Sequence, residues 1–180
     1  MKKARTMRTM STTIPTIRNR RAGLLVGGAL VTLGLGCKPQ TPRPPFGPIT
    51  GAVIAELDVR VPTATKLVAD ALRADSLPVS RVELRDGWIE TPWFDSQTRA
   101  PTTARRLGPG VVRIRAWLDP ARPGYSRLHI ETVERPLADP SLPERELEQQ
   151  VPLDHPIGTR VQEIVAALVK QYGGADSAGP

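Results

Sequence analysis

Two groups of side chains in this sequence have the types and spacing needed for acid–base chemistry. Asp154 stands beside His155, and Glu144, Glu146 and Glu148 alternate along the chain. A carboxylate can orient an imidazole base, and paired carboxylates can share the roles of acid and base. Asp154 also precedes a predicted helix, where a carboxylate caps free backbone N–H groups. The three glutamates lie in a proline-rich segment, which favours a solvated acidic surface.

Other arrangements that support catalysis are missing from the sequence. It contains no H-E-x-x-H, G-x-S-x-G or Walker-type glycine loop. His129 falls in the middle of a predicted strand, where a histidine is more often a cross-strand neighbour than a ligand. We therefore expect no catalytic residues, no metal ligands and no cofactor, and we expect that the protein is not an enzyme.

Tryptophans and arginines are the candidates for binding a partner. Trp88 and Trp117 fall at strand positions that point away from the predicted apolar face, so we expect them on the outer surface. Exposed tryptophans are common anchors of protein interfaces, although the proline-rich segment 136–153 could instead cover them. Arg105 and Arg106 lie in a long polar loop, where they could bind an acidic partner or a lipid head group, or be solvated.

The formal net charge of +7 comes from the N-terminal part of the chain. Residues 1–37 contain seven of the 25 lysines and arginines and no acidic residue, so the remaining 18 basic residues balance the 18 acidic ones. A domain that binds phosphate backbones should keep a basic face of its own. We therefore expect no nucleic-acid partner.

An uncharged apolar run follows the basic N-terminal residues. It covers residues 22–36 and has 15 residues, whereas a helix that crosses a membrane needs about 20. A basic region followed by a short apolar run is typical of an export signal. Cys37, the only cysteine, comes directly after the run. A single cysteine excludes an internal disulfide and any site built from several thiolates.

The segment Leu33-Gly34-Leu35-Gly36-Cys37 resembles the lipobox of bacterial lipoprotein signal peptides. The resemblance implies that residues 1–36 are a signal peptide, cut between Gly36 and Cys37. It also implies that the Cys37 thiol receives a diacylglycerol and that the new amino group is acylated with a fatty acid such as palmitate. Gly34 stands where that family usually has an aliphatic residue. Two alternatives stay open: a secretory peptide with an incidental cysteine, and an uncleaved membrane anchor.

The residues after Cys37 predict where the protein resides. In enterobacterial lipoproteins, an Asp directly after the modified cysteine resembles a signal for retention in the inner membrane. This sequence has Lys38 at that position. The resemblance therefore implies a lipid-anchored protein on the periplasmic side of the outer membrane, with the outer face of the cytoplasmic membrane as the alternative. Residues 38–48 contain five prolines in eleven residues, which predicts an extended tether. At about 3.1 Å per residue, it would act as a passive spacer of roughly 30 Å.

Residues 49–173 predict a single α+β domain, and residues 174–180 predict a flexible tail. Apolar residues alternate with polar ones in the expected strands and recur at helical spacing in the expected helices. The predicted order is β-α-β-β-β-β-α, at residues 53–61, 62–77, 82–85, 88–91, 111–118, 127–134 and 157–172. An antiparallel sheet with one apolar face needs a cover. We expect the long C-terminal helix to lie across it, in a helix-grip-like arrangement.

Two predicted pairings fix the register of the sheet. Asp86-Gly87 is typical of a two-residue hairpin turn, which pairs Leu84 with Ile89 and places both, with Trp93, on the core face. The two later strands pair through the turn at 119–124. This pairing places the apolar residues of both strands on the same face of the sheet. Arg113 and Arg115 then lie on the opposite face, near His129 and Glu131 of the second strand.

The stretch 86–93, Asp-Gly-Trp-Ile-Glu-Thr-Pro-Trp, precedes the two later strands. Together with the element order and the lipobox-type leader, it resembles the component C lipoprotein of the outer-membrane β-barrel assembly machinery over residues 49–173. That family commonly carries two such domains, where this chain has one. The resemblance implies a non-enzymatic, membrane-anchored module that binds an envelope protein. The alternative is a periplasmic carrier that holds a small apolar ligand between the sheet and the C-terminal helix.

Overall fold

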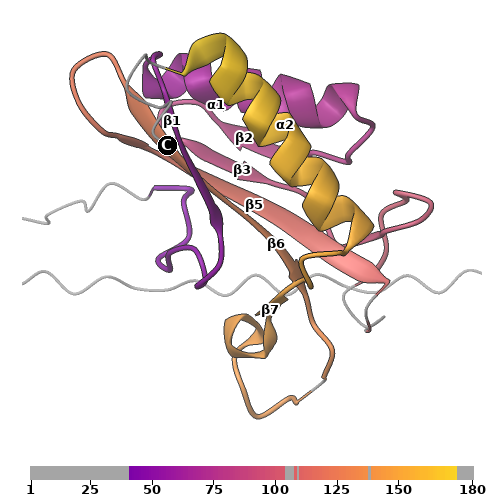
Figure 1. The fold of residues 1–180 in the computed structure, drawn as a ribbon. Coiled ribbons are helices and arrows are strands. Elements are labelled where there is room, and N and C mark those ends of the chain that lie inside the picture. The colour runs from indigo at the N-terminus through magenta and orange to yellow at the C-terminus, as the bar shows by residue number, and fades with distance from the viewer. Residues whose placement is uncertain (1–40, 104–107, 109, 138, 174–180) are drawn as a thin grey trace, which may run out of the picture. The chain divides into compact units, whose positions relative to one another are not determined.

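The computed structural model describes residues 41–103, 108, 110–137 and 139–173. Within these residues, an antiparallel sheet of seven strands carries two helices on one face (Figure 1). This confirms the predicted α+β class and the C-terminal helix that packs on the sheet. None of the helices in this part of the chain is long and apolar enough to cross a membrane.

The strands run in the spatial order β1-β6-β5-β3-β2, with β4 beside β5 and β7 beside β6. Two short strands, β4 and β7, were not predicted. The helices and strands are β1 (Val53–Leu57), α1 (Val61–Ala74), β2 (Arg81–Glu83), β3 (Trp88–Glu90), β4 (Phe94–Asp95), β5 (Val111–Pro120), β6 (Ser126–Glu134), η1 (Glu144–Leu147, a 3-10 helix), β7 (Gln149–Gln150) and α2 (Pro156–Tyr172).

The main core lies between the sheet and the two helices. Ile114 on β5 and Ile130 on β6 point toward this layer, where Val68 and Leu72 of α1 and Leu168 of α2 pack with them. Both helices therefore cover the sheet, whereas the sequence indicated the C-terminal helix as the cover. The amphipathic stripe of each helix explains this arrangement, because each must bury its own apolar face.

The hairpin between β2 and β3 differs from the prediction in its register. Val82 pairs with Ile89 and Glu83 with Trp88, so the turn has the four residues Leu84–Gly87 instead of two. Leu84 consequently leaves the core and is 43% exposed. The turn is fixed by β5, because the Gly87 carbonyl accepts a hydrogen bond from the Leu118 N–H at 2.8 Å.

Candidate functional site

The sheet face opposite the helices, here called the outer face, is covered by two segments of the same chain, residues 41–49 and residues 144–148. Trp88 and Trp117 lie on this face, as predicted, and their ring centroids are 4.8 Å apart. Of the two alternatives left open for these side chains, exposure or cover by another segment, the structure has the second, because Trp88 is 1% exposed and Trp117 is 0% exposed. Neither side chain is therefore available as a surface anchor for a partner.

The first covering segment consists of residues 41–49, here called the strap. The Phe46 ring lies edge-on to Trp117 with 6.4 Å between centroids. Arg43 donates to both carboxylate oxygens of Asp119, at 2.8 and 3.0 Å, and to the Asp86 carbonyl at 3.3 Å. The predicted passive spacer is therefore wrong for residues 41–48. An aromatic ring and an arginine among the prolines give this stretch contacts that a solvated polyproline chain lacks.

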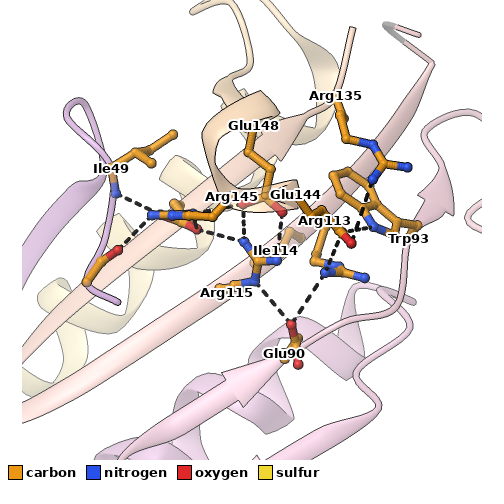
Figure 2. Close-up of polar contacts among 12 residues, drawn as sticks. Ile49, Glu90, Trp93, Arg113, Ile114, Arg115, Arg135, Glu144, Arg145 and Glu148 are labelled. Carbon is orange, nitrogen blue, oxygen red and sulfur yellow. Dashed lines mark hydrogen bonds and ion pairs between the residues drawn. The ribbon is translucent and has the colours of Figure 1, made fainter. Parts of the chain in front are cut away.

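The third tryptophan, Trp93, also lies on the outer face, so the predicted face is wrong, although the side chain is buried in a small cluster with Val111 and Val133. Its Nε1 donates to Glu144 Oε1 at 2.9 Å, and the guanidinium groups of Arg113 and Arg135 lie 4.5 and 5.6 Å from its ring centroid (Figure 2). β3 ends at Glu90, so the two-residue alternation assumed by the prediction does not continue as far as Trp93.

Arg115, on β5, is the centre of a buried ion-pair network on this face (Figure 2). Its two terminal nitrogens donate to the two carboxylate oxygens of Glu148 at 2.5 and 2.8 Å. Its Nε donates to Glu90 at 3.1 Å, and Nη1 also donates to Glu131 at 3.3 Å. The side chains of Arg115 and Glu148 are 4% and 0% exposed. Such two-pronged, charge-assisted contacts fix side-chain geometry strongly.

Arg145, in η1, connects this network to the strap. It donates to the two oxygens of Glu131 at 2.5 and 3.0 Å, to Glu148 at 3.0 Å and to the Gly47 carbonyl at 2.7 Å. The Ile49 N–H in turn donates to Glu131 at 2.8 Å. One guanidinium therefore joins β6, the 144–148 segment and the strap, which are distant in sequence.

The electrostatics of the network keep Arg115 and Glu148 charged. Burial alone would raise the pKa of Glu148, but hydrogen bonds and charge from Arg115 and Arg145 outweigh burial and lower it. Burial alone would lower the pKa of Arg115, but Glu148 and Glu90 raise it well above its usual range. A general acid or base must exchange protons near the working pH. The arrangement of Glu148 therefore favours a structural role over proton transfer.

The glutamates considered for acid–base chemistry consequently have different environments. Glu146 is exposed, as predicted for a solvated acidic surface. The same prediction is wrong for Glu148, which is buried, and Glu144 forms an ion pair with Arg113 at 3.3 Å. The predicted strand register contained one signal for this network, because it placed Arg115 near Glu131.

The Asp154–His155 pair is arranged differently from the prediction. His155 occupies the N-cap position of α2, and its Nδ1 accepts a hydrogen bond from the Ile157 N–H at 3.3 Å. The predicted cap at Asp154 is wrong because the helix begins at Pro156, one residue after His155. The other histidine, His129, pairs with Trp117 across β5 and β6.

A pocket of about 310 Å³ opens between the strap and the neighbouring strands. Charged groups of both signs surround it, with proline and aromatic side chains at the strap side. The lining residues are Pro42, Pro44, Phe46, Arg81, Trp88, Glu90, Arg113, Arg115, Glu144, Arg145 and Glu148. In the chain segments that the structure describes, no three His, Cys, Asp or Glu side chains are arranged to hold a metal ion.

Four predicted site residues lie outside the described residues: Gly36, Cys37, Arg105 and Arg106. Comparisons with known proteins add no relative for the chain. Neither the models of known protein families nor the curated protein sequences gave a match.

Proposed function

We propose that the protein is a non-enzymatic, lipid-anchored module that binds another protein of the cell envelope. Its place is the periplasmic side of the outer membrane, with the outer face of the cytoplasmic membrane as the alternative. The observation that carries the proposal is the order of a basic region, a short apolar run and the sole cysteine, Cys37. Diacylation and a further acyl chain would hold the protein stably on a membrane without a spanning helix.

The outer face supports a binding role over a catalytic one. Its buried charges neutralise one another, as in a rigid scaffold, and Glu148 is held ionised by Arg115 and Arg145. The pocket beside the strap is the part of this face that can receive a partner. Arg81 on its rim has a half-exposed side chain whose Nε lies 4.0 Å from Glu83, so we propose that its outer nitrogens pair with an acidic side chain of the partner.

The geometry of the core weighs against the ligand-carrier alternative. A carrier needs space between the sheet and α2. Aliphatic side chains occupy that layer: Leu57, Ile114 and Ile130 from the sheet, with Ile164 and Leu168 from α2, are each at most 8% exposed. A native mass spectrum with a retained apolar molecule would reverse this preference.

Intact-mass analysis of the membrane fraction tests the anchor. We expect a mature chain that begins at Cys37 and carries the added mass of diacylglycerol and a fatty acid. The variant Cys37→Ala should lose this mass and remain as uncleaved precursor or leave the membrane. A mature species without lipid mass, or one that retains residues 1–36, would contradict the proposal.

Affinity capture from detergent-solubilised membranes tests the binding role. We expect one partner in stoichiometric amount with the wild-type chain and its loss with Arg81→Glu. Arg73→Glu, on α1, is the matched control, because the side chains of Arg81 and Arg73 are both 50% exposed. Recovery of the protein alone would count against a binding module, and equal loss in both variants would count against the pocket.

A further inference from the structure

The strap determines how far the folded domain can stand from the lipid anchor. Arg43 holds the chain against Asp119 and the carbonyl of Asp86. Cys37 lies only six residues before Arg43 in the sequence, and an extended chain advances at most about 3.5 Å per residue. If Cys37 carries the lipid, the membrane surface therefore lies within about 20 Å of the Arg43 backbone, which leaves little room for another folded layer between them.

The contacts of Arg43 lie at one end of the sheet, here called the loop end. Three connections between elements lie there. They are the link from β1 to α1, which contains Arg60, the turn Leu84–Gly87 between β2 and β3, and the hairpin tip Ala121–Tyr125 between β5 and β6. Asp86 belongs to the second connection, and Asp119 lies just before the third. Arg60 and the hairpin tip line one shallow pocket of about 360 Å³. The segment nearest the anchor is therefore in direct contact with the loop end.

The exposed side chains of the loop end suit the surface of an anionic bilayer. Arg60, Arg85 and Arg122 are exposed, and Leu84 beside Arg85 is 43% exposed. The Arg122 guanidinium stacks on the Tyr125 ring at 3.8 Å. Arginine at a membrane surface is attracted by anionic head groups. Tyrosine and exposed leucine side chains are stabilised at the interface between head groups and acyl chains.

We propose that the loop end rests on the lipid surface. Leu84 enters the interface, and Arg60, Arg85 and Arg122 lie against the phosphates of anionic phospholipids. The acidic groups at this end do not prevent the contact, because Asp119 is paired with Arg43, and the three exposed arginines outnumber Asp58 and Asp86. This inference rests on the proposed lipid anchor at Cys37 and adds an orientation to it.

A fluorescent probe at two exposed leucines tests the orientation. In the lipidated full-length chain, Cys37 is blocked by its thioether, so a thiol-reactive, polarity-sensitive dye labels only an introduced cysteine. The test variant is Leu84→Cys, and the control variant is Leu153→Cys. Leu153 lies just before the N-terminus of α2, away from the loop end, and is 86% exposed. Each is reconstituted into phosphatidylcholine vesicles with and without phosphatidylglycerol.

We expect a blue shift and quenching by a lipid-borne quencher for the dye at position 84, and neither for the dye at position 153. The effect should be larger with phosphatidylglycerol, and the triple change Arg60→Ser, Arg85→Ser, Arg122→Ser should abolish that difference. Equal solvent exposure of both dyes in vesicles that retain the protein would overturn the orientation alone. If the protein does not float with the vesicles and carries no lipid mass, the anchor and the orientation both fail.

Discussion

Arg115→Met is the substitution that most directly tests the role of the outer-face network. Methionine keeps the length of the arginine stem and fills much of its volume, but it removes the guanidinium. The two-pronged contact with Glu148, at 2.5 and 2.8 Å, and the contact with Glu131, at 3.3 Å, are then lost. Two fully buried carboxylates, Glu131 and Glu148, would then share the single positive charge of Arg145.

The expected loss follows from this uncompensated charge. Removing one partner of a buried ion pair costs about 3–5 kcal/mol, because the other charge stays desolvated. We expect a decrease of that size in the free energy of unfolding. With a urea dependence of about 2 kcal/mol per molar, the unfolding midpoint should fall by roughly 2 M. The double variant Arg115→Met, Glu148→Leu removes one charge of each sign and should recover a large part of the loss.

Urea unfolding followed by tryptophan fluorescence is the assay, since Trp88 and Trp117 are buried beside the network. Arg127→Met is the matched control. Arg127 pairs with Glu56 at 2.7 Å, but its side chain is 50% exposed, so its loss should cost less than about 1 kcal/mol. A cost below about 1 kcal/mol for Arg115→Met would refute the reasoning, as would a double variant in which the two single losses simply add.

Three further predictions concern the turn, the pH dependence and the strap. Gly87→Ala should cost at least about 2 kcal/mol in urea unfolding, because φ is +61° and a Cβ would lie 2.1 Å from a backbone oxygen; Gly110→Ala, in open space, should be nearly neutral. The pKa of Glu148 is lowered in the fold, so unfolding takes up a proton. Its stabilisation should be complete above its ordinary pKa of 4.5 and should vanish as pH falls through the lower folded pKa; a pH series that Glu148→Gln leaves unchanged would contradict this. Phe46→Ala should loosen the strap at a cost of about 1 kcal/mol, and hydrogen exchange at the Ile49 amide should accelerate; an unchanged rate would show that the ring does not hold the strap.

Alternation along the strands was enough to predict the faces of the central sheet. It placed Trp117 opposite the helices and Arg115 near Glu131, as the structure has them. This succeeds because side-chain direction in a strand depends only on the local two-residue period. The same reasoning failed for Trp93, because β3 ends at Glu90 and the count no longer applies.

Contacts between distant segments could not be predicted in the same way. Exposure of Trp88 and Trp117 depends on what covers the outer face, and the strap that covers Trp117 precedes the sheet in sequence. Glu148 lies in a segment without periodicity, so its burial follows from its ion pairs with Arg115 and Arg145 and not from a repeating sequence pattern. The predicted pairing of Leu84 with Ile89 was wrong for a related reason. The turn at Gly87 is fixed by its hydrogen bond with β5 and not by the hairpin sequence alone.

The way in which the strap is tied has a consequence for the order of folding. The Ile49 amide and the Gly47 carbonyl bond to partners 82 and 98 residues further along the chain. Strands β5 and β6 are sequence neighbours and can pair early, whereas contacts this distant carry a higher loop-closure cost. The contact between Arg145 and the strap therefore forms only after the 144–148 segment has settled on the sheet. Until residues 144–148 reach the sheet, the strap lacks its contact with Arg145, and Arg115 lacks its two-pronged contact with Glu148.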